Sequence, residues 1–274
     1  PVAEGRQRLD ETQKVVAVRD DAAQPGLVDL GPFGKLGSRL DGSLVDGLLL
    51  ASEQSHGTYD RRMSTTGHDQ TADDPRGAKA ALRADLIAAR QQRPATTRLE
   101  SDRARTGLVL AALRDVEPSV IALYLSVPPH APRPEPGTIE LATALWTLGH
   151  QILAPVLSPT PSGPRHDPDW AWFTGPADLR PGLWGIPEPT GPALGAEAIV
   201  QADLVLASAL GATRDGRRLG VGGGWFDRAL PLRRPGTPVW VLLDDDEVLD
   251  DLPSEPHDEA VDALVLPSGV VYCH

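Results

Sequence analysis

VIALYLSVPPHAPRPEPGTIELATALWTLGHQILAPVL, residues 120–157, decides the fold class of this chain of 274 residues. An apolar, β-branched run over Val120–Ser126 predicts a buried strand, and a similar run covers Ile152–Leu157. A proline-rich loop and a helix predicted over Thr138–Leu148 connect the two runs. This succession is typical of a right-handed βαβ unit with parallel strands. We therefore predict an α/β fold, a three-layer sandwich around a mostly parallel sheet.

The same periodicity rules place the remaining elements. Upstream we predict two helices, Arg76–Arg93 behind an Asp74-Pro75 cap and Arg98–Arg114 behind a Thr97–Glu100 capping box. Downstream, strands are predicted at 170–174, 204–207, 239–243 and 263–266, and a short helix at 225–230. Ligands of parallel sheets bind beyond the carboxyl ends of the strands, and Glu135 lies in the loop just past one such end.

The stretch GRRLGVGGGWFDRAL, Gly216–Leu230, has the composition of a phosphate-binding loop. Glycine has no Cβ and tolerates positive φ, so the N–H groups of Gly220–Gly224 can converge on one anion. Arg218 precedes the glycines, and Asp227 after them can hold the metal ion that accompanies a phosphate. A bare glycine run is also typical of a flexible surface loop, and the spacing matches neither a Walker A loop nor a Rossmann fingerprint. We interpret the loop as a site for phosphate and Mg²⁺.

This stretch resembles the signature GxRLGxGxGxYDRxL of the 5-formyltetrahydrofolate cyclo-ligase (methenyltetrahydrofolate synthetase) family. Three further motifs follow the family's order: Lys79 with Arg83, EPGTIEL from Glu135, and LPSEPHDEAVDAL at 252–264. The resemblance covers about 78–269. It implies ATP- and Mg²⁺-dependent cyclisation of 5-formyltetrahydrofolate to 5,10-methenyltetrahydrofolate, with release of ADP and phosphate. It also implies a Rossmann-like architecture, similar to that of sugar-phosphate isomerases and CoA transferases.

The resemblance assigns a role to each matching residue. It implies an ATP site formed by Lys79, Arg83, Arg218, Leu219, Gly220, Val221, Gly222, Gly223, Gly224 and Trp225. It implies a folate site formed by Arg83, Glu135, Trp225 and Phe226, with Glu135 near the formyl group. Asp227 and Asp258 would bind Mg²⁺, and catalysis would depend on Lys79, Arg218 and Glu135.

Residue spacing alone is also consistent with interpretations in which these residues have no functional role. Lys79 and Arg83 share one helix face, which describes a solvated basic edge equally well. A lone Glu135 in a proline-rich loop is usually exposed, and His257 has no partner at ligand spacing. The acidic run Asp244–Glu247 is interpreted as solvated rather than as a metal site, because contiguous carboxylates point in different directions.

Several stretches depart from the family pattern or match it without implying chemistry. Trp225-Phe226 replaces two tyrosines, which keeps ring stacking but loses phenol hydrogen bonds. SALGATRDG, at 208–216, replaces PGLAFDxxG. WGIPEP, at 184–189, resembles the family's FGIxEP, and we predict that Trp184 and Ile186 pack around a turn.

Composition narrows the partners and the compartment. The formal net charge of −12 disfavours binding to nucleic acid or anionic lipid. Cys273 is the single cysteine, and no apolar run approaches the roughly 20 residues that cross a bilayer. We predict a cytoplasmic monomer or weak homodimer whose partners are the two small molecules, ATP and the folate. Of the arginines near the glycine loop, Arg217, Arg218, Arg228, Arg233 and Arg234, only Arg218 is assigned to the site.

Residues 1–74 differ from the rest of the chain. They show no sustained period and do not match the family, so we predict a poorly structured N-terminal extension before a cyclo-ligase-like domain at 75–274. Met63, the single methionine, is either the natural start or an internal residue of a genuine tail.

Two other functions also stay open: a paralogue that binds ATP or folate without turnover, as a regulatory or storage module, and an isomerase- or transferase-like enzyme that needs no ATP.

Overall fold

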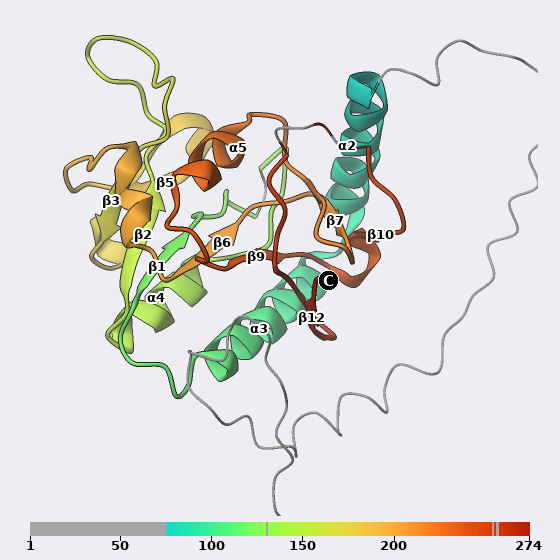
Figure 1. Ribbon diagram of the computed structural model, residues 1–274, viewed down its shortest axis with the longest axis horizontal. Coiled ribbons are helices and arrows are strands. Elements are labelled where there is room, and N and C mark those ends of the chain that lie inside the picture. Colours follow the sequence, from blue (N-terminus) through green and yellow to red (C-terminus); the bar gives the residue numbers. More distant parts are fainter. Residues whose placement is uncertain (1–74, 130, 254, 256–257) are drawn as a thin grey trace, which may run out of the picture.

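A seven-stranded sheet forms the centre of the computed structural model, which describes residues 75–129, 131–253, 255 and 258–274. The strand order is β12-β11-β9-β6-β1-β2-β3 (Figure 1). Its members are β1 Val120–Leu123, β2 Gln151–Pro155, β3 Trp170–Phe173, β6 Leu204–Ala207, β9 Val239–Leu242, β11 Ala263–Leu266 and β12 Gly269–Tyr272. Only the pairs β2 with β3 and β11 with β12 are antiparallel, so the predicted mostly parallel sheet is confirmed.

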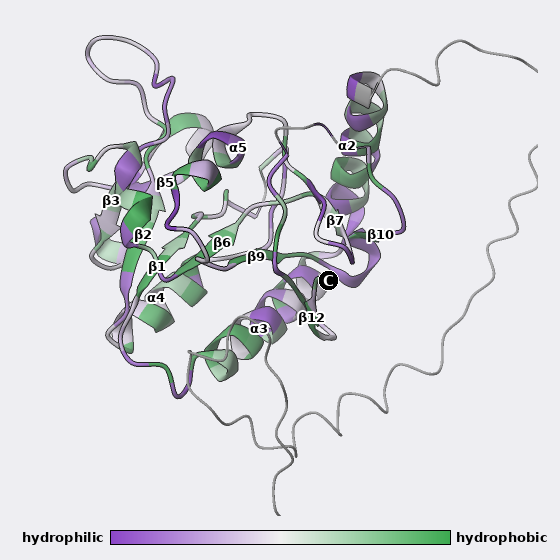
Figure 2. Cartoon of the chain, viewed as in Figure 1, coloured by the Kyte–Doolittle hydropathy of each residue, from purple (hydrophilic) through white to green (hydrophobic). Residues whose placement is uncertain are grey.

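Helical segments cover both faces of this sheet, which confirms the three layers. On one face, α3 (Ala95–Ala112) and α4 (Ile139–Thr147) pack Val109, Leu141 and Leu145 against the strands. On the other, η4 (Ala196–Gln201), α5 (Trp225–Ala229) and η5 (Leu230–Leu232) contribute a second apolar cluster. Successive residues of a strand point to opposite faces. Hence inner strands such as β1 and β6 are apolar along their whole length, and Figure 2 colours them as hydrophobic.

A smaller sheet, β10-β7-β8, lies beside the main one and carries the start of the glycine loop. Its strands are β7 Gly211–Thr213, β8 Arg218–Leu219 and β10 Val248–Leu249. Helix α2, Pro75–Gln92, packs here through Leu86, which joins Leu210, Leu219 and Leu252 in a separate apolar cluster. The remaining elements are β4 Leu179–Pro181, β5 Pro187–Pro189, η2 Pro176–Asp178, η3 Leu183–Gly185 and η6 Asp245–Glu247.

The structure corrects four local predictions. Helix α3 begins at Ala95 behind Pro94, whose φ of −55° already suits a helix start, so the predicted Thr97–Glu100 box lies inside the helix. The departing stretch 208–216 contains a strand that was not predicted, β7, and a further unpredicted strand, β12, follows the one predicted at 263–266. Trp184 does not pack around a turn: it has a φ of 58° and is 74% exposed.

Some predictions concern residues that the structure does not describe. Residues 1–74, including Met63 and Asp74 of the proposed helix cap, lie outside the described residues, as does His257. Among the described residues, no helix is both long enough and apolar enough to span a membrane.

Leu206→Ala is expected to lower the free energy of unfolding by about 2–5 kcal/mol, because it opens a cavity in the central strand β6, where Leu206 is fully buried. Leu148→Ala, at an exposed leucine after α4, is the matched control and should change stability by less than about 0.5 kcal/mol. Urea unfolding of both variants measures the difference. Equal effects would contradict this account of the core.

Candidate active site

One face of helix α2 brings together segments that are far apart in the sequence. Lys79, Arg83 and Arg90 follow each other at intervals of four and seven residues, so their side chains leave the same side of the helix. Lys79 reaches the segment before β11, Arg83 reaches the glycine loop, and Arg90 reaches the loop after β1. Helix α2 is therefore the common backing of the predicted site.

Lys79 is buried, with 3% of its surface exposed, so the interpretation as a solvated basic edge is wrong for this residue. Its Nζ donates to Asp258 Oδ2 at 2.6 Å and to Glu255 Oε2 at 3.0 Å. Burial alone would lower the pKa of Lys79, but the hydrogen bonds and charges of the two carboxylates raise it above its ordinary value. Lys79 is thus a charged ammonium group held beside Asp258, a predicted metal ligand.

The glycine loop follows β8 and uses its glycines where side chains would be strained or obstructed. Gly222 and Gly224 have φ values of 100° and 63°, in the left-handed region. Arg83 Nε donates to Gly220 O at 2.9 Å, which ties the loop to α2. Gly223 is exposed, and a Cβ there would meet no atom of the described residues within 4 Å. The loop therefore leaves open space beside Gly223.

Arg218 and Asp227 form an ion pair at the two ends of the loop. Arg218 is 5% exposed, its Nη1 donates to Ser208 O at 3.2 Å, and its Nε has no hydrogen-bond partner within the described chain. Burial lowers the pKa of Arg218, against the opposing effect of Asp227. A buried guanidinium with an unused donor is well suited to a further anionic group.

The two predicted metal ligands fit Mg²⁺ carried by a nucleotide. Asp227 and Asp258 offer hard oxygen donors, and each already lies beside one of the predicted phosphate-binding cations. In the part of the chain that the structure describes, no group of three or more His, Cys, Asp or Glu side chains forms a metal cluster. Mg²⁺ is commonly bound by one or two carboxylates together with substrate phosphates and water, which matches this donor set.

The aromatic pair after the glycines divides between surface and core. Trp225 is partly buried and makes edge-to-face contacts with Trp170 and Phe226, with ring centroids 4.7 and 4.9 Å apart. Phe226 is buried in the apolar cluster beneath α5. Packing therefore accounts for Phe226, whereas Trp225 borders the loop.

The other arginines near the loop have partners of their own. Arg228 Nη1 donates to Gly223 O at 3.3 Å, and the remaining three form ion pairs: Arg217 with Asp215 and Asp251, Arg233 with Glu259, and Arg234 with Asp203. Because Arg218 is ion-paired as well, its assignment to the site rests on its burial and its unused Nε and stays a prediction.

Glu135 lines a cavity of about 410 Å³ between α2, α3 and the loop after β1. The residue is partly buried, so the interpretation as an exposed loop residue is wrong. Burial raises the pKa of Glu135, against the opposing effects of the Val127 N–H group and Arg90. The residues of the glycine loop are not among the described residues that line this cavity.

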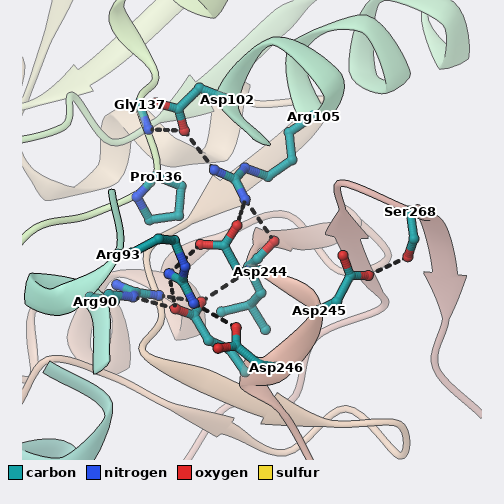
Figure 3. Close-up of polar contacts among 12 residues, drawn as sticks. Arg90, Arg93, Asp102, Arg105, Pro136, Gly137, Asp244, Asp245, Asp246 and Ser268 are labelled. Carbon is teal, nitrogen blue, oxygen red and sulfur yellow. Dashed lines mark hydrogen bonds and ion pairs between the residues drawn. The ribbon is translucent and has the colours of Figure 1, made fainter. Parts of the chain in front are cut away.

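An ion-pair network, shown in Figure 3, contributes several of the residues that line this cavity, and sequence reasoning missed it. Glu247, 2% exposed, accepts two bonds of 2.7 Å from Arg90. Asp244 is also buried and pairs with Arg93 at 2.6 Å and with Arg105 at 2.7 Å. The prediction of a solvated acidic run is therefore wrong for its first and last residues. Asp244 and Glu247 also form a capping box, whose D-x-x-E spacing marks the start of the short helix η6 but not the distant arginine partners.

Comparison with known proteins gives a consistent result. A sequence profile described as the 5-formyltetrahydrofolate cyclo-ligase family matches residues 75–267. The 5-formyltetrahydrofolate cyclo-ligase of Mycolicibacterium smegmatis is 38% identical over 138 residues, which is 50% of this chain and 71% of that protein.

Two solved structures share the fold. The 5,10-methenyltetrahydrofolate synthetase of Aquifex aeolicus superposes with a TM-score of 0.55 at 22% identity, covering 71% of this chain and 92% of its own. The 5,10-methenyltetrahydrofolate synthetase of Mycoplasma pneumoniae gives 0.52 at 18% identity, covering 68% and 97%.

Glu135→Gln is expected to gain stability relative to the wild type as the pH rises. Because the folded-state pKa of Glu135 is raised, the folded protein holds this proton more tightly, and the carboxyl group lowers stability as the pH rises through the window above the ordinary value of 4.5. Below that window both states are protonated, and the group has no effect. Urea unfolding from about pH 4 to about pH 7 measures the difference. A difference that does not change with pH would contradict the raised pKa.

Proposed function

Because this chain belongs to the 5-formyltetrahydrofolate cyclo-ligase family, we propose that the residues gathered by α2 carry out its ATP-dependent reaction. The observation that supports this assignment is the pairing of two buried cations, Lys79 and Arg218, with two carboxylates around an open glycine loop. In MgATP, the phosphates would pair with Lys79 and Arg218, and the Mg²⁺ ion would pair with Asp227 and Asp258. The charges of the site and of the ligand are therefore complementary.

The reaction needs positioning rather than an enzyme nucleophile. The formyl oxygen on N5 of 5-formyltetrahydrofolate attacks the γ-phosphorus of ATP, and ADP leaves with the electron pair of the broken P–O bond. The formyl carbon is now a phosphorylated iminium. N10 attacks this carbon and loses its proton, and the C–O bond then breaks to release phosphate and 5,10-methenyltetrahydrofolate. Catalysis by electrostatic stabilisation and orientation fits a site of cations, amides and carboxylates.

Each proposed residue has a part in this sequence. Lys79, Arg218 and the amides of Gly220–Gly224 would hold the phosphates, and Arg83 ties the loop to α2 in reach of both substrates. Asp227 and Asp258 would hold Mg²⁺, which neutralises charge on the transferred phosphoryl group. Glu135, which lines the cavity beside α2 and α3, would contact the folate near the formyl group.

These contacts support ATP binding and do not separate it from turnover. A paralogue that binds ATP without turnover would also use the buried, ion-paired Lys79 and Arg218, so the assay below is what distinguishes it from an enzyme. The departing stretch 208–216 still supports the site, since Ser208 O accepts a hydrogen bond from Arg218. An isomerase- or transferase-like enzyme would also use a loop that binds phosphate, but its turnover would not need ATP. A cytoplasmic location and a monomeric or weakly dimeric state stay predictions.

Asp227→Asn is expected to lower kcat/KM by at least about 100-fold, because the variant loses charge at the proposed metal ligand. The measurement is the near-ultraviolet absorbance of 5,10-methenyltetrahydrofolate as it forms, with and without MgATP. Asp203→Asn, at an exposed ion pair with Arg234, is the matched control and should retain activity. Wild-type protein that binds both substrates without forming product would support the paralogue instead, and turnover without ATP would support the isomerase-like enzyme.

Gly223→Ala is expected to weaken ATP binding about tenfold without lowering stability, because its Cβ would enter the open space where we place the phosphates. Gly107→Ala is the matched control, since a Cβ there also meets no described atom within 4 Å but lies in α3. Isothermal titration with MgATP compares the two variants. Unchanged ATP affinity in Gly223→Ala would argue against a phosphate at this point of the loop.

A further inference from the structure

We propose that Asp102 and Arg90 are positioning residues for the reaction, which fix the turn Pro134–Gly137 and thereby place the carboxylate of Glu135. The proposal rests on the proposed role of Glu135 as the group that contacts the folate. Both residues belong to the buried network of Figure 3, which joins α2 and α3 to the turn.

Asp102, on α3, holds the end of the turn. Its Oδ1 accepts a bond from the Gly137 N–H at 2.8 Å and another from Arg105 Nη2 at 2.6 Å. Residue 137 must be small for this approach, since a Cβ on Gly137 would lie 2.5 Å from Asp102 Oδ2. The carboxylate and the turn therefore fit against each other without space for a side chain.

Arg90, on α2, holds the start of the turn. Its Nη1 donates to Pro134 O at 3.3 Å and its Nη2 to Ala209 O at 2.8 Å, while Glu247 accepts from both Nε and Nη2. A planar guanidinium that uses all three nitrogens has little freedom to move. Arg90 thus connects the turn to the segment between β6 and β7, which leads towards Arg218.

The backbone contacts matter because the Glu135 side chain itself is held weakly. Its one hydrogen bond given by the structure is accepted from the Val127 N–H group at 3.4 Å. The buried Tyr124 Oη donates to Pro136 O at 3.0 Å, so the residues before and after Glu135 are all fixed through the main chain. A displaced turn would displace the carboxylate, and a shift of about 1 Å at a reacting group can cost about 100-fold in rate.

The network lies beside the cavity in which we place the folate. Asp102 and Glu135 both line the cavity of about 410 Å³. Arg105 pairs with Asp244 at 2.7 Å and donates to Leu243 O at 3.0 Å, so it keeps buried partners when Asp102 is replaced. The Asp102 variants below therefore remove the contact to the turn while the rest of the network stays paired.

The test compares Asp102→Ala, Gly137→Ala and the double variant in the absorbance assay. We expect each single variant to raise the KM for 5-formyltetrahydrofolate and to lower kcat/KM about tenfold or more, with the KM for ATP within about twofold of the wild type. The double variant should be no worse than Asp102→Ala, because the collision between the new Cβ and the carboxylate is then absent. Asp246→Ala is the matched control, an exposed carboxylate that pairs with Arg93 in the same network and does not contact the turn.

Three results would decide against the proposal. Wild-type kinetics in Asp102→Ala would overturn it, and so would equal losses for ATP and folate together with a lower urea midpoint, which indicate a purely structural role. Additive losses in the double variant would also overturn it. Asp102→Asn, which keeps the size of the side chain, gives the same comparison if the alanine variant does not fold, with a smaller loss expected in the same parameters. Failure of the proposed function is separate, because it appears as inactive wild-type protein or a fully active Glu135→Gln.

Discussion

The buried pair of Arg90 and Glu247 is the interaction on which the arrangement of the site depends. Both side chains are almost completely removed from water, so either charge would strongly destabilise the fold without the other. Arg90 donates two hydrogen bonds to the carboxylate of Glu247, and this bidentate contact fixes where α2 lies against the loop after β9. Everything that α2 carries towards the glycine loop takes its position from that docking.

The main sheet and the site obey different physical rules. The sheet is held by apolar clusters on both faces, in which close packing tolerates many combinations of side chains. The site is held by ion pairs and main-chain hydrogen bonds, each of which needs a particular partner at a particular distance. This division fits an architecture that is shared with proteins of about a fifth sequence identity.

Sequence reasoning predicted the parallel sheet and the residues of the glycine loop, because apolar runs and glycine spacing are local signals. It missed β7 and β8, whose pairing brings 211–213 against 218–219 with little apolar alternation to mark it. It also placed Asp244 and Glu247 in solvent, since the arginines that bury them lie more than 130 residues away in the chain. Long-range charge pairing leaves no periodic trace, so only the fold reveals it.

The attachment of α2 has a consequence for how the protein loses its function. This helix contributes little to the two large clusters and joins the body through ion pairs and one small cluster around Leu86, Leu210, Leu219 and Leu252. Segments with few apolar contacts open at lower free energy than the core. Local opening would therefore detach α2 while the sheet stays intact, and salt would promote it only weakly because the ion pairs of Lys79 and Arg90 are buried. The protein would then be inactive while most of its core is still folded.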